Sequence, residues 1–213
     1  MVKINRKITQ VNYTPLTNKR NMWLVIHYVG AVSTAKANAQ YFEKEKRNAS
    51  ANYFVDENEI WQVVDDYNGA WHVGANKYYN SCRNNNSIGI EMCCKRKGTK
   101  GEWYFEEQTV TNTIELVKEL MKKYNIPIER VCRHFDVTGK ICPEPYVRDE
   151  VAWTNFLKRV QEEKMEEIQP TIQEKCKIIR DYYGLDENTT LYFQFYRYNV
   201  ALIDKLYYKA KNP

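Results

Sequence analysis

The chain has 213 residues, of which 43% are hydrophobic and 28% are charged, and its formal net charge is +5 at neutral pH. This composition excludes a disordered or collagen-like chain, and the length suits one α/β domain with a small appendage. The mild basic excess favours an anionic partner, such as a bacterial cell-wall polymer, a membrane surface or nucleic acid, and does not distinguish among them.

The N-terminal segment and the cysteines bear on where the protein acts. Residues 1–21 are basic but contain no apolar core and no cleavage motif, so we expect synthesis in the cytoplasm without a secretory signal. No apolar run in the sequence reaches the roughly 18 residues of a membrane-spanning helix. The six cysteines form neither a CxxC pair nor a disulfide framework, and we therefore expect mostly reduced thiols.

Strands and helices are predicted to alternate in the first half of the chain. Residues 21–30 and 87–94 are short apolar runs that indicate buried strands. Residues 52–64 indicate a hairpin, because two β-prone runs flank a short acidic turn. The Ala-rich residues 34–48 follow a Ser-Thr pair and predict a helix.

The same alternation continues toward the C-terminus. Apolar residues recur at helical spacing in residues 109–125, which predicts a helix with Thr109 or Thr111 as its N-cap. A short strand is predicted at residues 131–137, and a further amphipathic helix at residues 147–164. This order favours an α/β fold in which a sheet is flanked by helices.

The composition changes after Lys164, where residues rich in tyrosine and helix formers begin. We therefore divide the chain into an α/β domain, residues 1–164, and a small helical module, residues 165–213. The sequence "GLDENT" separates two helical patterns in this module, and Asp186 or Asn188 is the expected cap. The aromatic residues of the module suit a core or a dimer surface.

The sequence "RHFDVTGKICPEPY", residues 133–146, combines groups that a turn does not need for its shape. His134 and Cys142 flank the predicted turn, and His27 lies at the end of a predicted buried strand. Taken singly, each is more often a buried core residue with a local hydrogen bond. A zinc site that leaves one position open for water uses three protein ligands of these types, so the combination is a candidate metal site.

The order of several motifs supports that interpretation. The segments "IHY", "ANYFVDENEIWQVV", "AWHVG", "SIGIEMC" and "RHFDVTGKICP" follow one another within residues 20–160. In this order they resemble the zinc-dependent type 2 N-acetylmuramoyl-L-alanine amidases, which include phage endolysins, bacterial autolysins and peptidoglycan-recognition proteins. The resemblance implies a central mixed β-sheet flanked by helices. It also implies hydrolysis of the amide bond between N-acetylmuramic acid and L-alanine in peptidoglycan.

The resemblance implies a role for four residues at the metal site. His27, His134 and Cys142 match the three zinc ligands of the family. Zinc acidifies a bound water and polarises the substrate carbonyl. Lys140 matches the family lysine that stands beside the oxyanion formed when water attacks the amide.

The general base is the point at which this sequence departs from one branch of the family. That branch carries a tyrosine in the strand after the first helix, where this chain has Ala51. Tyr53 stands two positions later, and we assign it no catalytic role. Another branch uses the glutamate of "SIGIE", which is Glu91 here, and a lone glutamate in a buried strand needs a partner or a metal. We therefore expect Glu91 to be the general base.

Other residues are expected to line the substrate cleft. His72 matches a family position in the cleft and is expected to donate to a substrate carbonyl, while an ordinary turn histidine is the alternative. Trp71 is expected to stack on a sugar, Trp61 to pack in the core, and Arg83 to meet a peptide carboxylate. Asp136 is expected to hold the turn or a ligand histidine.

The expected partner is bacterial peptidoglycan, reached after release of the protein from the cytoplasm, as for a phage or prophage endolysin. A host autolysin is the second enzymatic interpretation. A non-catalytic peptidoglycan-binding protein on the same fold is a third, although all three ligand positions are filled here. A nucleic-acid binder has the charge of +5 alone in its favour.

Overall fold

The computed structural model describes residues 3–18, 21–98, 101–162, 171–186 and 199–211. The chain divides into two compact units, residues 1–162 and residues 163–213, and each is described by itself. The boundary that the sequence predicts at Lys164 lies outside the described residues.

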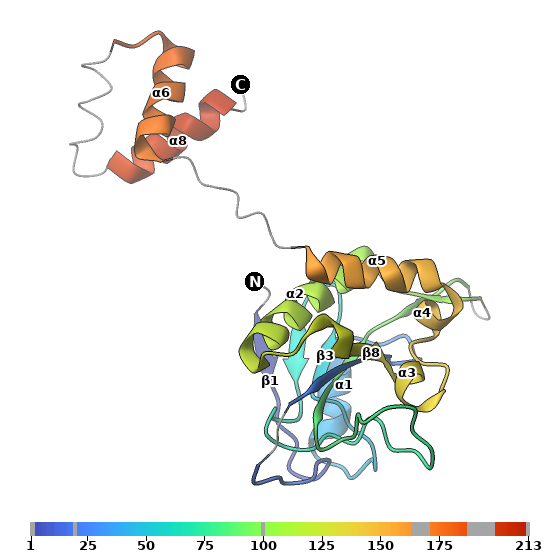
Figure 1. Cartoon of the computed structure of the whole chain (residues 1–213). Coiled ribbons are helices and arrows are strands. Elements are labelled where there is room, and N and C mark those ends of the chain that lie inside the picture. The colour runs from blue at the N-terminus through green and yellow to red at the C-terminus, as the bar shows by residue number, and fades with distance from the viewer. Residues whose placement is uncertain (1–2, 19–20, 99–100, 163–170, 187–198, 212–213) are drawn as a thin grey trace. The chain divides into compact units, whose positions relative to one another are not determined.

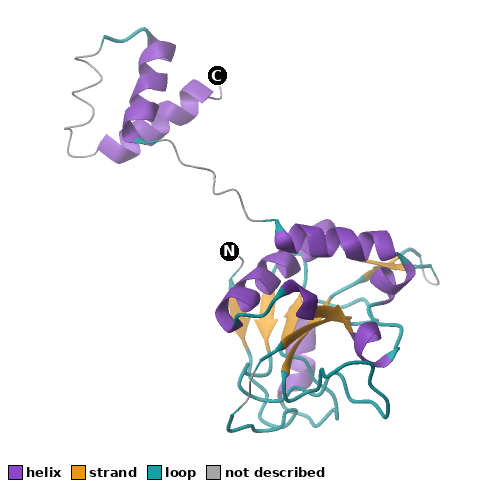
Figure 2. Ribbon diagram, viewed as in Figure 1, coloured by secondary structure: helices purple, strands orange, loops and turns teal. Residues whose placement is uncertain are grey.

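The larger unit is built on a six-stranded mixed sheet with the strand order β1-β4-β3-β5-β2-β8 (Figures 1 and 2). Among its described strands, β3 and β4 pair antiparallel and all other neighbours pair parallel. The prediction of a mixed sheet flanked by helices is confirmed. The strands are β1 (Ile4–Arg6), β2 (Trp23–Tyr28), β3 (Tyr53–Val55), β4 (Ile60–Gln62), β5 (Ser87–Met92) and β8 (Val131–Arg133).

Helices cover both faces of this sheet. Helix α2 (Glu107–Tyr124) packs on β3 and β5, and α5 (Glu150–Gln161) packs on α2. On the other face, α1 (Ala35–Glu43) packs on β3 and β4. The larger unit also has a hairpin of β6 (Lys95–Arg96) and β7 (Trp103–Tyr104). Its short helices are η1 (Ile128–Arg130), α3 (His134–Thr138) and α4 (Glu144–Arg148).

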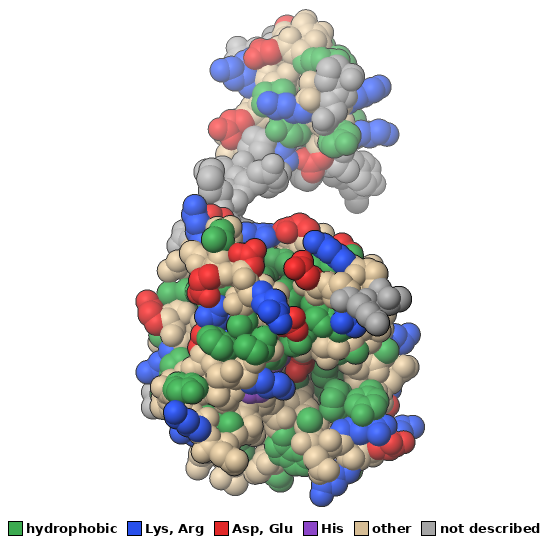
Figure 3. Space-filling model, turned by 90° about the vertical axis from the view of Figure 1, so that its right-hand side faces the viewer, with side chains coloured by type: hydrophobic (Ala, Val, Ile, Leu, Met, Phe, Trp, Pro, Cys, Tyr) green, Lys and Arg blue, Asp and Glu red, His purple; other side chains and the backbone are tan. Residues whose placement is uncertain are grey.

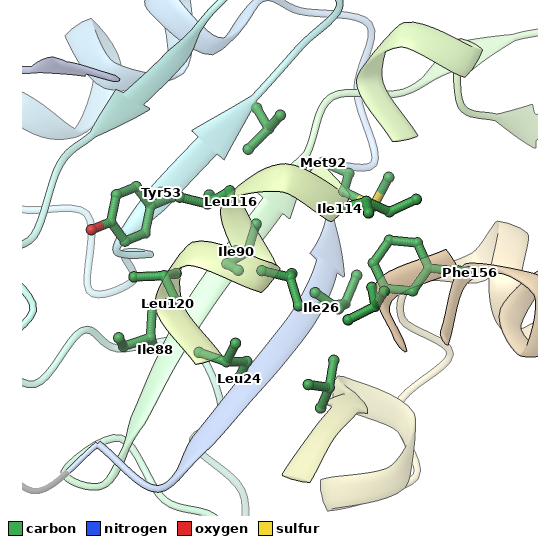
Figure 4. Close-up of a cluster of buried hydrophobic side chains, with 14 of the residues drawn as sticks. Leu24, Ile26, Tyr53, Ile88, Ile90, Met92, Ile114, Leu116, Leu120 and Phe156 are labelled. Carbon is green, nitrogen blue, oxygen red and sulfur yellow. The ribbon is translucent and has the colours of Figure 1, made fainter. Parts of the chain in front are cut away.

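The main core lies between the sheet and helices α2 and α5 (Figure 4). Side chains alternate between the two faces of a strand, so every second residue of β2 and β5 points into this core. Each fully buried side chain of this kind contributes about 1.5–3 kcal/mol. Its fully buried members include Leu24, Ile26, Ile88, Ile90, Met92, Leu116 and Phe156. The intervening residues of both strands face the opposite side, which is where the candidate site lies.

The helix boundaries differ from the sequence predictions in ways that have local causes. Helix α1 begins after Thr34, whose side chain accepts from the Ala37 N–H, and ends at Glu43 rather than at residue 48. Helix α2 begins at Glu107, so neither Thr109 nor Thr111 is its N-cap. The first two residues of α2, Glu107 and Gln108, are polar and precede the apolar periodicity, which is why the pattern placed its start too late.

Two further segments were assigned incorrectly. The segment expected to be a strand at residues 131–137 stops at Arg133, and α3 follows at once. The helix expected at residues 147–164 is two helices, α4 and α5, that meet at Asp149. The Asp149 carboxylate accepts from the Ala152 N–H, so this residue ends one helix and caps the next.

The smaller unit is helical in its described part. Helix α6 (Ile172–Tyr183) starts with a capping box of Thr171 and Glu174, and packs on α8 (Asn199–Lys211). Residues 187–198 lie outside the described part. They include the expected cap Asn188 and the aromatic residues Tyr192, Phe193, Phe195, Tyr196 and Tyr198. In the parts of the chain that the structure describes, no helix is long and apolar enough to cross a membrane.

A chain that ends at Glu162 is expected to fold by itself. Its hydrophobic clusters are drawn from residues of the larger unit, while Cys176, Ile179 and Ile203 form a separate cluster in the smaller unit. Thermal unfolding followed by near-ultraviolet circular dichroism should give the same midpoint as the first unit in the full chain. Insolubility, or loss of the near-ultraviolet signal, would show that the smaller unit belongs to the same core.

Candidate active site

The parallel pairing of β2 with β5 places His27 directly opposite Glu91. Residues that are in register on neighbouring strands point to the same face of the sheet, so both side chains lie on the face that does not carry α2. Both residues are close to the carboxyl ends of their strands. That edge is the usual place for ligands in open α/β sheets.

His134 reaches the same place from β8, the neighbour of β2 on its other side. It is the first residue of α3, and the Asp136 carboxylate caps this helix by accepting from the Arg133 N–H at 2.8 Å. The buried Arg133 guanidinium contacts Asp136 at 2.9 Å and Glu150 of α5 at 2.6 Å. These contacts hold α3, and with it His134, against the sheet. Asp136 therefore acts on the helix that carries a histidine ligand candidate.

Cys142 is brought back to His134 by the loop that follows α3. Gly139 ends the helix with a φ of 81°, a conformation that favours glycine. The Phe135 N–H then donates to the Cys142 carbonyl at 2.9 Å, which closes the loop. The sequence predicted a turn here, and the structure has a short helix followed by this loop.

The ligand atoms of His27, His134 and Cys142 form one buried cluster. They lie within 4.8 Å of one another, with 3.1 Å between the two Nδ1 atoms and 3.7 Å from His27 Nδ1 to Cys142 Sγ. Tetrahedral zinc with ordinary bond lengths separates two nitrogens by about 3.3 Å and a nitrogen and a sulfur by about 3.6 Å. The three side chains therefore fit a zinc ion with an open fourth position.

Burial sets the protonation of these three groups. It lowers the pKa of His27, and the neighbouring His72 and His134 add to this effect. It also lowers the pKa of His134 to about 4, so this ring is neutral at pH 7, the form that binds metals. Burial raises the pKa of Cys142 to about 12. A metal ion must therefore displace the proton of this thiol when it binds.

Glu91 and Lys140 line the same pocket of about 290 Å³ as the three ligand candidates. Figure 3 shows histidine surface in a depression of the larger unit beside a basic side chain. Burial raises the pKa of Glu91 to about 8, while the positive charge of Lys140 acts in the opposite direction. The buried Oε2 atom of Glu91 has no hydrogen-bond partner among the described residues. Such a carboxylate in a cleft is typical of a functional site.

The residues expected to bind substrate differ in their positions. Trp71 and His72 line the pocket. His72 is buried, and its ring nitrogens lie 3.0 Å from His27 Nε2 and 3.0 Å from Ser87 Oγ, which differs from the expected donation to a substrate. Arg83 donates to the backbone carbonyls of Asn80 and Cys82 and does not line the pocket. In this structure its Nη1 group is engaged within its own loop, and its expected contact with a substrate carboxylate stays a prediction.

Three contributors to the site were missed in the sequence. The Asn84 side chain accepts from the backbone N–H groups of His72 and Val73, and Ser87 contacts the His72 ring. Gly89 leaves the space in which that ring lies. Gly89 in "SIGIE" could have indicated this contact from the sequence, because a glycine within a buried strand often marks a place where another group approaches the backbone closely.

Tyr53 is directed away from the pocket. Its hydroxyl donates to Asp66 at 2.8 Å, and its side chain is part of the main core. Burial raises its pKa well above the ordinary value. Trp61 packs against the cluster of α1 and β3, as expected for a core residue. These contacts occupy the Tyr53 hydroxyl on the far side of the sheet from the pocket.

Comparisons with known proteins agree with this geometry. The family described as N-acetylmuramoyl-L-alanine amidase matches residues 18–145. A probable N-acetylmuramoyl-L-alanine amidase of Bacillus licheniformis is 37% identical over 147 residues, which cover 64% of this chain and 40% of the relative. The amidase CwlL of the same species is 33% identical over 174 residues, which cover 75% of this chain and 47% of CwlL. The chain thus spans less than half the length of these two relatives.

Two solved structures match about three quarters of this chain. The structure of PlyL has 25% sequence identity and a TM-score of 0.64, and the match covers 75% of this chain and 98% of PlyL. The catalytic domain of XlyA has 25% sequence identity and a TM-score of 0.62, and the match covers 75% of this chain and 99% of the XlyA domain. The match to the family over residues 18–145 spans more than half of the sequence. The chain therefore belongs to the N-acetylmuramoyl-L-alanine amidase family.

Proposed function

We propose that this protein hydrolyses the amide bond between N-acetylmuramic acid and L-alanine in bacterial peptidoglycan, with a zinc ion as its cofactor. The observation that carries the proposal is the buried His27, His134 and Cys142 cluster, which lies in one pocket with Glu91 and Lys140. The family of the chain supports the choice of bond. The products are a free lactyl carboxylate on the sugar and a free amino group on L-alanine.

His27, His134 and Cys142 would hold the zinc ion through Nδ1, Nδ1 and Sγ. Bound zinc supplies a Lewis acid that acidifies a water molecule and polarises the scissile carbonyl. The donor set suits zinc, because two neutral imidazoles and a thiolate are its preferred ligands. Burial of all three side chains keeps bulk water away from the ligand atoms.

Glu91 is the general base in this proposal. Its carboxylate accepts a proton from the attacking water and returns it to the nitrogen of the leaving L-alanine. A raised pKa suits this exchange, because a group with a pKa near the working pH both takes and gives a proton. Glu91 Oε2 is unengaged by described protein groups and is therefore available for this transfer.

Lys140 and Trp71 complete the pocket. The ammonium group of Lys140 stabilises the negative oxygen of the tetrahedral intermediate. Trp71 is half-buried, with its indole N–H donating to Thr14 at 2.8 Å, so its orientation is fixed before the substrate arrives. Its ring offers a flat surface to a sugar or to the stem peptide.

The setting we propose is that of a phage or prophage endolysin, with residues 165–213 as a module for wall binding or oligomerisation. Tethering of this kind raises the local concentration of the substrate. A host autolysin would use the same chemistry. A non-catalytic peptidoglycan-binding protein is less well supported, because all three ligand positions and the base position are filled.

Purified protein should release new L-alanine amino groups from bacterial cell walls. Removal of metal by a chelator should abolish this release, and added zinc should restore it, because the pocket offers no other electrophile of comparable strength. The Cys142→Ser variant should bind zinc weakly and expose few new amino groups, since a neutral hydroxyl is a poor zinc ligand. Amino groups of a residue other than L-alanine, or release that survives the chelator, would contradict the proposal.

Glu91→Gln is expected to keep the fold and the zinc ion but to lower the rate of hydrolysis roughly 100-fold or more. The amide has the same shape as the carboxyl group and cannot accept a proton. Zinc content, measured by elemental analysis, serves as the control for an intact site. An unchanged rate would assign the base role to another group.

Lys140→Met is expected to slow hydrolysis roughly 100- to 1,000-fold, because it removes a donor to the oxyanion. It should also move the acidic limb of the pH–rate profile to higher pH. The Lys140 charge lowers the pKa of Glu91, so the base ionises at a higher pH once that charge is gone. Lys140→Arg is the control, because it keeps the positive charge. If the acidic limb does not move in Lys140→Met, the Lys140 charge does not set the pKa of Glu91.

A further inference from the structure

A line of buried polar contacts leads from a backbone carbonyl to the candidate metal ligand His27. Ser87 Oγ lies 2.6 Å from the Arg83 carbonyl oxygen and 3.0 Å from His72 Nε2. His72 Nδ1 in turn lies 3.0 Å from His27 Nε2. On its other side, the His27 ring presents Nδ1 to His134 and Cys142.

The direction of each hydrogen bond follows from the first one. A carbonyl oxygen accepts and cannot donate, so the single hydroxyl proton of Ser87 is given to the Arg83 carbonyl. Ser87 Oγ then faces His72 Nε2 with a lone pair, and this nitrogen must carry a proton. A neutral His72 with its proton on Nε2 has a bare Nδ1.

The same reasoning reaches the metal ligand. A bare Nδ1 on His72 accepts, so His27 Nε2 must carry the proton of the His27 ring. His27 Nδ1 is then left with a free lone pair, and it is this atom that lies in the cluster with His134 and Cys142. The opposite direction of donation would place a proton on His27 Nδ1, where it would occupy the ligand position.

We infer that Ser87 and His72 are positioning residues that fix the tautomer of His27, so that Nδ1 is always the atom free to bind a metal. The inference rests on the metal site of the proposed function. Histidine ligands usually donate their second N–H to a carboxylate, a carbonyl or water. Here the acceptor is a neutral imidazole, whose own orientation is set by Ser87.

The surrounding backbone is built to hold the His72 ring in this line. A Cβ atom at Gly89 would lie 2.6 Å from His72 Cγ, so the ring occupies space that only glycine leaves free. The Gly89 backbone cannot move away easily, because its N–H and carbonyl both bond to Asn52 at 3.0 Å. Asn84 holds the His72 backbone by accepting its N–H at 3.1 Å.

The tautomers can be read directly, because the sequence contains three histidines and their signals can be assigned. Long-range ¹H–¹⁵N spectra of the full chain, freed of metal, should show His27 and His72 each protonated at Nε2. Zinc should then shift the Nδ1 signals of His27 and His134 while His27 stays protonated at Nε2. A proton on Nδ1 of either His27 or His72 in the metal-free protein would overturn the inference.

Matched variants test the line through zinc affinity. Ser87→Ala removes the acceptor for His72 and should weaken zinc binding about 10- to 100-fold, the usual effect of losing an outer partner of a ligand. Thr113→Val is the control, because it removes a buried hydroxyl that also donates to a backbone carbonyl, but from helix α2. Affinity is measured by competition with a chromophoric zinc chelator. Equal affinity in the two variants would contradict the inference.

A second pair perturbs the same line without removing a polar group. Gly89→Ala should displace the His72 ring and lower zinc affinity, while Gly74→Ala, where a Cβ meets no atom within 4 Å, should not. Equal zinc affinity in these two variants would also count against the inference. None of these measurements uses turnover. An active enzyme in which His27 or His72 carries its proton on Nδ1 would contradict this inference alone. A protein with the predicted tautomers that exposes no new L-alanine amino groups would contradict the proposed function alone.

Discussion

The register of β2 against β5 is the constraint on which the rest of the site depends. In this register, Leu24, Ile26, Ile88 and Ile90 enter the core beneath α2 and α5, while His27 and Glu91 meet on the other face. A slip of one residue would send the polar side chains into the core and the apolar ones into the pocket. The burial of the apolar side chains therefore also fixes which ligand candidate stands beside the expected base. The fold and the site are stabilised by the same strand pairing.

The positions of His134 and Cys142 in the pocket depend on a second, local set of contacts at the end of β8. The strand stops at Arg133, whose backbone N–H and guanidinium both bond to Asp136. This contact starts α3 at His134, and Gly139 ends the helix one turn later so that Cys142 returns to the pocket. The contact with Glu150 then ties this short helix to α5, one of the two helices that cover the main core. A helix of five residues has little stability of its own, so these contacts are what hold it.

The sequence was sufficient for the ligand candidates and for the class of fold, because both leave local patterns. Short apolar runs predicted β2 and β5, and His27 together with the His134 and Cys142 of "RHFDVTGKICP" gave the candidate metal ligands. The partners of His72 could not be predicted, because His27 and Ser87 are distant from it in sequence and meet it through tertiary packing. Arg83 was expected to meet a peptide carboxylate, and its Nη1 group donates to two carbonyl groups of its own loop, which the sequence did not indicate. Polar side chains have several partners within reach, and burial decides among them.

Two acid groups of the pocket, Cys142 and Glu91, both lie near the charge of Lys140. Burial raises the pKa of Cys142 to about 12 and that of Glu91 to about 8, and the charge of Glu91 adds to the shift of Cys142. Without a bound cation, the positive charge of Lys140 opposes the rise in the pKa of both Cys142 and Glu91. Buried acids of this kind are held in their neutral forms until positive charge enters the site. A divalent cation at His27 Nδ1 would favour ionisation of the thiol and of the carboxyl group together. In the proposed mechanism, binding of the cation would therefore leave Glu91 ionised, the form in which it could accept a proton from water.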